Sequence, residues 1–191
     1  MILDVSLHGR RVGAIVREPE TSVHQEDFAQ VRGILPEYKY AGASYEGLAR
    51  LVGDLCGQED MLEFLRRVMF AILAGNTDAH LKNWSLVYPD RRTAWLAPTY
   101  DRVFVRYYLP TNKLALPIAK EKDPARIGWE HVARLERFLR SHGLDAPVVA
   151  EACAFVRRCL EAWEACRQEF AEAQRARLEE HLAGMPLGRI G

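Results

Sequence analysis

Several features are scarce or missing in this sequence of 191 residues, and each absence narrows the class of protein. The six histidines form no HxxxH or HExxH pair and the four cysteines form no CxxC pair, which argues against a zinc site. Cysteines without such pairing are typical of reduced thiols in a cytosolic protein. The longest apolar run, Val68 to Ala74, is too short to span a membrane. No basic segment followed by a long apolar run stands at the N-terminus, so we expect no signal peptide and a cytoplasmic location.

The formal net charge is zero, because 26 Lys and Arg residues balance 26 Asp and Glu residues. A neutral chain has no overall electrostatic attraction to the phosphates of nucleic acid, so no direct nucleic-acid partner is expected. What the sequence does contain is ordinary for a globular protein, with 49% hydrophobic and 27% charged residues. A chain of this length can bury a hydrophobic core without disulfides or metals.

Periodicity predicts a short strand region followed mainly by helices. Residues 2–17 alternate around His8-Gly9-Arg10, which predicts a β-hairpin. Ser22 and Gln25 fit a capping box, which predicts a short helix through Phe28 that stops near Gly33. Further helices are expected at 45–55, 60–74 and 128–142, and a last one, capped by Asp145, that runs to about residue 182 whole or as a broken pair.

The stretch from residue 76 to residue 85 carries the clearest chemical signal. Asp78 and Asn83 have the D-x-x-x-x-N spacing of kinase catalytic loops. Phosphoryl transfer needs an acceptor for the proton of the attacking hydroxyl and hard oxygen ligands for Mg²⁺. Asp78 suits the first role and the side-chain oxygen of Asn83 the second. The alternative is a loop aspartate that only forms a turn or caps a helix.

A second metal ligand is expected from the next hairpin. Strands are predicted at 84–88 and 93–97. With residues 90–91 at the centre of the turn, Trp84 pairs with Ala97. Asn83 and Asp101 then lie at the same end of the hairpin, so the base and both ligands converge.

Two further residues of the motif each fit two roles. His80 suits a general acid or a contact to the γ-phosphate, and equally a hydrogen-bonded structural histidine. Lys82 suits a cofactor-binding role, neutralising phosphate charge, and equally an ordinary solvated lysine.

The run GNTDAHLKNWSL at 75–86, followed by LAPTYDRV at 96–103, resembles the C-terminal domain of HipA-like kinases, the toxins of bacterial toxin–antitoxin modules. HQEDFAQ at 24–30, PEYKY at 36–40 and KLALPIA at 113–119 extend the resemblance, which covers roughly residues 22–183. It implies an α+β, mainly helical fold, a protein-kinase-like C-terminal lobe with a catalytic hairpin.

The same resemblance implies a role for each residue of the motif. It makes Asp78 the catalytic base and makes Asn83 and Asp101 the Mg²⁺ ligands, with ATP as phosphate donor and a protein serine or threonine as acceptor. It also implies an antitoxin as partner and an aminoacyl-tRNA synthetase as one possible protein substrate.

The resemblance divides the chain into residues 1–20, similar to the start of full-length members, a kinase lobe at 21–185 and a tail at 186–191. The stretch that holds the phosphate-covering loop and the ATP-contacting lysine in those members is missing between the first two. Residues 42–47 are the glycine-bearing candidate for a replacement, but they lack the G-x-G-x-x-G spacing. Two hypotheses follow. The chain is a kinase, alone or with a second chain that supplies the missing lobe, or it is an inactive pseudokinase or truncated toxin remnant that binds proteins.

Overall fold

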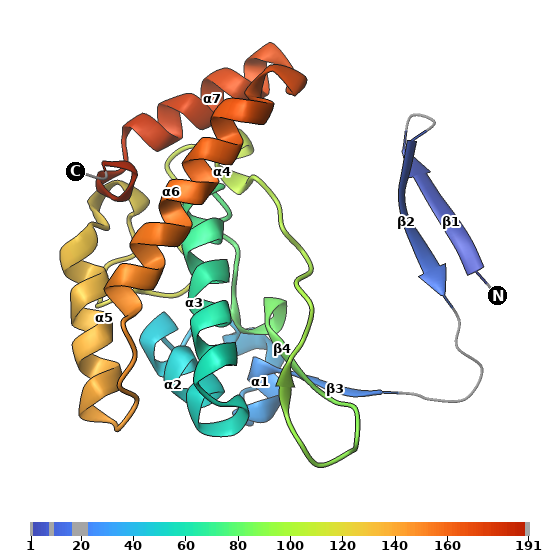
Figure 1. Cartoon of the computed structure of the whole chain (residues 1–191), viewed down its shortest axis with the longest axis vertical. Coiled ribbons are helices and arrows are strands. Elements are labelled where there is room, and N and C mark those ends of the chain that lie inside the picture. Colours follow the sequence, from blue (N-terminus) through green and yellow to red (C-terminus); the bar gives the residue numbers. More distant parts are fainter. Residues whose placement is uncertain (1, 8–9, 17–22, 190–191) are drawn as a thin grey trace.

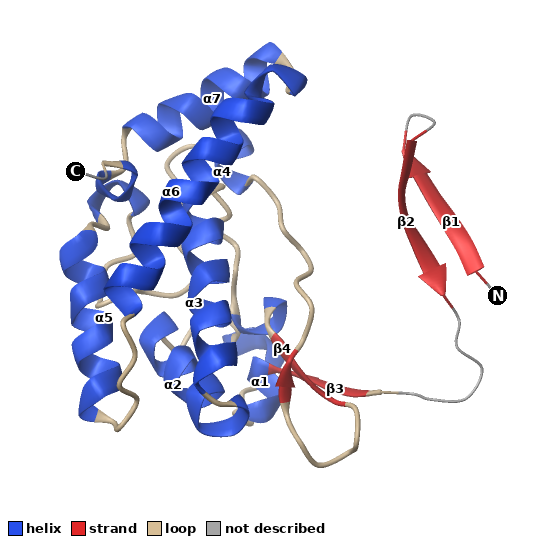
Figure 2. Cartoon of the chain, viewed as in Figure 1, coloured by secondary structure: helices blue, strands red, loops and turns tan. Residues whose placement is uncertain are grey.

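The computed structural model describes residues 2–7, 10–16 and 23–189. Helices dominate the described residues, and the strands form two small antiparallel sheets (Figure 2). The predicted mainly helical α+β class is therefore confirmed. No helix among the described residues is long and apolar enough to cross a membrane.

The first sheet is the predicted N-terminal hairpin. Strands β1 (Ile2–Leu7) and β2 (Arg10–Val16) pair antiparallel, with Ile2 opposite Val16. The turn expected at residues 8–9 lies outside the described residues. Figure 1 shows this hairpin as a sheet of its own, separate from the three-stranded sheet of the helical body.

The helical body has five helices of eight residues or more within 23–189. They are α2 (Tyr45–Cys56), α3 (Gln58–Leu73), α5 (Trp129–Ser141), α6 (Val148–Cys166) and α7 (Glu172–Ala183). The first three confirm the helices predicted at 45–55, 60–74 and 128–142. The C-terminal stretch is the broken pair, because a 3-10 turn at Arg167–Glu169 separates α6 from α7 (Figure 1).

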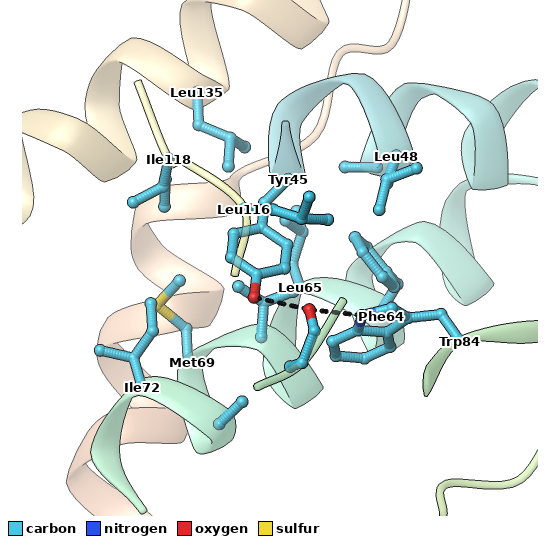
Figure 3. Close-up of a cluster of buried hydrophobic side chains, with 14 of the residues drawn as sticks. Tyr45, Leu48, Phe64, Leu65, Met69, Ile72, Trp84, Leu116, Ile118 and Leu135 are labelled. Atoms are coloured by element: carbon cyan, nitrogen blue, oxygen red, sulfur yellow. Dashed lines mark hydrogen bonds between the residues drawn. The ribbon is translucent and has the colours of Figure 1, made fainter. Parts of the chain in front are cut away.

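Helix α3 is the centre of the core. It packs against α2 and α6, and its apolar side chains point to more than one neighbour (Figure 3). Side chains from α2, from residues 114–118 and from α5 surround it. The buried set drawn there comprises Tyr45, Leu48, Phe64, Leu65, Met69, Ile72, Trp84, Leu116, Ile118 and Leu135. The prediction of a central helix that is apolar on most faces is confirmed, and Gly75 ends it with a φ of +64°.

The predicted start of the first short helix is wrong. Residues His24–Asp27 form strand β3, and the helix α1 covers only Phe28–Val31. Asp27 is the N-cap, and its side chain and that of Gln30 form the capping box. The residues before Asp27 are extended because their backbone pairs with strand β4 (Ser85–Tyr88). Ser22, the expected cap, lies outside the described residues.

The predicted register of the second hairpin is wrong by one residue. Strand β5 covers only Trp95–Leu96, and Leu86 pairs with Leu96. The turn is longer than expected because the Asp90 carboxylate accepts hydrogen bonds from the backbone N–H groups of Arg92 and Thr93. This Asx-type turn adds a residue to the loop.

The expected cap of the C-terminal helix is also wrong. Pro147 stands at the N-cap of α6, and Asp145 instead pairs with Arg140 of α5, with Oδ1 2.9 Å from Nε. A strong charge partner on the preceding helix thus keeps the Asp145 side chain away from the helix N-terminus. A short helix, α4 (Val105–Tyr108), lies between β5 and α5.

Candidate active site

The loop between α3 and β4 is a fixed turn that exposes one carboxylate. Asn76 donates its backbone N–H to the carbonyl of Ala71, and its side-chain oxygen accepts the N–H of Asp78. The carbonyl of buried Ala79 accepts hydrogen bonds from the Tyr45 hydroxyl at 3.1 Å and from the Trp84 indole at 3.3 Å (Figure 3). Around Asp78 the loop is buried, whereas Asp78 itself is exposed. The loop therefore presents the predicted base to solvent on a rigid support.

Asn83 and Asp101 meet in space, as predicted from the hairpin. The side-chain oxygen of Asn83 accepts the backbone N–H of His80 at 3.0 Å, and its Nδ2 donates to Asp101 Oδ2. The Asp101 carbonyl accepts a hydrogen bond from Asn76 Nδ2 at 3.3 Å. The two predicted metal ligands are therefore in direct contact.

The loop of Asn83 and the loop of Asp101 meet because two side chains tie them together. They do so although the hairpin register differs by one residue from the predicted one. Tyr100 donates its hydroxyl hydrogen bond to the carbonyl of Lys82 at 2.8 Å. The guanidinium of Arg102 lies 4.2 Å from the ring centroid of Trp84. Asp101 stands between these anchors with a φ of +54°, a left-handed conformation that aspartate tolerates better than most residues.

Asp78, the predicted base, has a neighbour that the sequence reasoning missed. Tyr40 donates its hydroxyl hydrogen bond to Asp78 Oδ1 at 2.7 Å. Its ring packs edge-on against His80 at 5.1 Å, and Lys39 Nζ lies 5.0 Å from the Tyr40 ring centroid. Partial burial, together with the hydrogen bond and negative charge of Asp78, raises the pKa of Tyr40 to about 12. No local pattern marks this residue, because it precedes Asp78 by 38 positions.

His80 and Lys82 lie at the site in different environments. His80 is 6% exposed, and its Nδ1 has no hydrogen-bond partner among the described residues. Burial, and next the positive charge of Lys39, lower its pKa, so the imidazole is neutral at pH 7. A neutral imidazole is a poor general acid, and a ring nitrogen without a partner differs from a fully hydrogen-bonded structural histidine, so the role of His80 stays a prediction. Lys82 is exposed, and its backbone carbonyl rather than its side chain holds the site together.

The available donors fit magnesium carried with phosphates. Asp101 offers a carboxylate, and the Asn83 oxygen retains one lone pair after accepting from His80. Mg²⁺ in nucleotide sites uses one or two carboxylates and completes its shell with water and substrate phosphates. The described part of the chain contains no cluster of three or more His, Cys, Asp or Glu residues that could enclose a metal.

The glycine-bearing stretch at 42–47 is a helix start. Ser44 is the N-cap of α2, and its hydroxyl accepts the backbone N–H of Gly47 at 3.2 Å. Gly47 thus belongs to the first turn of a helix, as expected for a loop that enters one. Lys39 lies just after a 3-10 turn at Pro36–Tyr38 and is on no strand of the described chain.

Comparisons with known proteins place this geometry in a family. The model of the HipA-like C-terminal domain matches residues 10–171. A Sinorhizobium fredii protein named "Putative kinase Y4dM" is 38% identical over 162 residues, which are 83% of this chain and 39% of that protein. A Haemophilus influenzae relative, likewise named as a kinase, is 36% identical over 119 residues, 55% of this chain and 34% of its own.

A solved structure shares the fold. It is the Shewanella oneidensis HipA toxin–antitoxin complex with HipB and operator DNA. The match has a TM-score of 0.67 at 21% identity and covers 96% of this chain and 45% of that one. This chain therefore spans less than half the length of the relatives it matches.

Proposed function

Because the chain belongs to the HipA-like C-terminal domain family, we propose that it is the catalytic lobe of a serine/threonine protein kinase of toxin–antitoxin type. The contact between Asn83 and Asp101, beside the exposed carboxylate of Asp78, carries the proposal. It joins hard oxygen donors from two loops, and one of these loops also carries the proton acceptor Asp78.

The residues divide the work of phosphoryl transfer as follows. Asp78 accepts the proton of the attacking hydroxyl. Asn83 and Asp101 would hold Mg²⁺, which supplies charge neutralisation for the phosphates of ATP. His80 fixes the Asn83 oxygen through its backbone N–H at 3.0 Å, so the ligand is oriented before substrate arrives. Catalysis of this type rests mostly on positioning and electrostatics, which the buried loop provides.

The proposal includes partners. The solved structure that shares the fold is a complex of a HipA toxin with HipB, which supports an antitoxin protein as partner of this chain. Aminoacyl-tRNA synthetases remain the proposed substrate class on the family resemblance. This chain spans 39% of Y4dM. If it does not bind ATP alone, a second chain is proposed to supply the lobe that covers the phosphates.

A second candidate is an inactive protein-binding module, a pseudokinase or toxin remnant. The helix start at Ser44 favours it, because residues 42–47 are then unavailable as a loop over the phosphates. The two candidates differ in nucleotide binding, since only a kinase needs ATP with Mg²⁺.

A thermal-shift titration with ATP and Mg²⁺, followed by a hydrolysis assay, tests the proposal. A kinase at ten times its Kd for ATP gains about 1.4 kcal/mol, a rise in melting temperature of roughly 3–6 °C for a chain of this size. Asp78→Asn should abolish Mg²⁺-dependent turnover, whereas the matched control Asp54→Asn, at an exposed aspartate of α2 that pairs with Arg50, should not. No nucleotide-induced rise at millimolar ATP would favour the binding module.

A further inference from the structure

The proposed base already holds a hydroxyl group. Tyr40 donates to Asp78 Oδ1 at 2.7 Å, which is the hydrogen bond that an acceptor alcohol makes with a general base before transfer. Tyr40 is 45% exposed, so the residue is accessible from solvent. A substrate hydroxyl must displace this phenol to reach the same carboxylate oxygen.

We propose that Tyr40 is a built-in phosphate acceptor, so that the chain modifies its own residue beside the base. The inference rests on the proposed kinase function. The Tyr40 oxygen attacks the γ-phosphorus of a nucleoside triphosphate, and an O–P bond forms. The bond from the γ-phosphorus to the β–γ bridging oxygen breaks, and the nucleoside diphosphate leaves with the electron pair. The phenolic proton passes to Asp78 and from there to solvent.

The surroundings of Tyr40 suit both the reaction and its product. The ring is held edge-on against His80 at 5.1 Å, so the hydroxyl keeps one orientation toward the base. With a pKa of about 12 the phenol stays protonated at neutral pH, and transfer therefore needs the carboxylate. Lys39, 5.0 Å from the ring centroid, lies close enough to compensate part of the product's negative charge.

The neighbouring tyrosines provide the contrast. Tyr38 is 57% exposed in the same loop, yet its side chain has no hydrogen bond to Asp78 in the described structure. Tyr45 is 1% exposed, and its hydroxyl donates to the carbonyl of Ala79. Exposure alone thus favours Tyr38 and burial excludes Tyr45, whereas contact with the base selects Tyr40.

The test is a phosphate map of the whole chain after incubation with Mg²⁺ and millimolar ATP. Mass spectrometry of the tryptic peptide 40–50 separates Tyr40 from Tyr45 by fragmentation. We expect phosphate on Tyr40 in the unaltered chain, a loss of at least 100-fold in Asp78→Asn, and loss of the mark in Tyr40→Phe. Tyr38→Phe should label like the unaltered chain. The map of the unaltered chain decides the matter even if a variant does not fold.

Each remaining outcome separates the inference from the function beneath it. Asp78-dependent hydrolysis without phosphate on Tyr40, or phosphate only on residues other than Tyr40, overturns the inference and leaves the kinase function standing. Phosphate on Tyr38 and Tyr40 alike, unaffected by Asp78→Asn, overturns it as well. No phosphate, no hydrolysis and no nucleotide-induced rise in melting temperature overturn both the inference and the function. A thermal shift without any phosphate on the chain overturns the inference alone.

Discussion

Gly75, the glycine that ends α3, should not tolerate a methyl group. Its φ of +64° costs an L-residue about 1–2 kcal/mol. An added Cβ would also come 2.7 Å from Cε2 and 2.8 Å from Cδ2 of Phe104, closer than carbon atoms pack. The Phe104 ring packs against Tyr107 and His181, so moving it away disturbs both contacts. Forcing a methyl into such a contact typically costs a further 1–3 kcal/mol or so.

The chain contains a matched control for the backbone part of this cost. Gly143 ends α5 with a φ of +83°, and nothing lies within 4 Å of the position its Cβ would take. Gly143→Ala should therefore lose about 1–2 kcal/mol of stability, and Gly75→Ala at least about 1 kcal/mol more. The difference isolates the contact with Phe104.

Urea unfolding followed by circular dichroism measures the two variants. With a slope of about 1–3 kcal/mol/M, an extra 1 kcal/mol lowers the midpoint of Gly75→Ala by roughly 0.3–1 M relative to Gly143→Ala. Equal midpoints, or a more stable Gly75→Ala, would refute the packing of Phe104 against the start of the loop that carries Asp78.

Three further perturbations test other parts of the site and core. Asp101→Asn removes a charged oxygen donor and should weaken Mg²⁺ binding about 10-fold or more, read from the Mg²⁺ dependence of the ATP-induced thermal shift. Arg102→Met keeps the apolar stem but loses the cation over Trp84, so urea unfolding should show a loss of about 0.5–2 kcal/mol, and no loss would refute the stacking. Burial lowers the pKa of His181, whose Nε2–H donates to the Ile72 carbonyl at 2.8 Å. The unfolded chain takes up the second imidazole proton more readily than the folded chain, so stability should fall as the pH drops below about 6.5. His181→Gln should flatten that dependence in melts between pH 5 and 7.

Helices were predictable because their signals are local. The apolar positions of α3 lie within that helix, and Gly75 and Gly143 lie two residues beyond the ends of α3 and α5. The first short helix was misplaced because the stretch contains two patterns that fit a capping box, one at Ser22 and one at Asp27. Pairing with β4, some 60 residues later, decides between them, and no local window contains that information.

The candidate site was predictable to the extent that it is built from one hairpin. Asn83 and Asp101 meet although the register was wrong by one residue, because side-chain anchors rather than strand pairing set their approach. Tyr40 escaped prediction since its place beside Asp78 results from the packing of a distant loop. The roles of Asp78, His80 and Lys82 stay predictions until activity is measured.

Trp84 contacts both loops of the candidate site. Its indole N–H donates to the carbonyl of Ala79, next to the base, while its ring face carries the guanidinium of the residue that follows Asp101. The ring centroids of Trp84 and Phe64 lie 4.8 Å apart, so the indole packs against a second ring. A shift of either loop therefore strains the other through the indole. Binding of a ligand at Asp78 and binding of a ligand at Asp101 would then be thermodynamically linked. Each ligand would change the affinity for the other by the same factor.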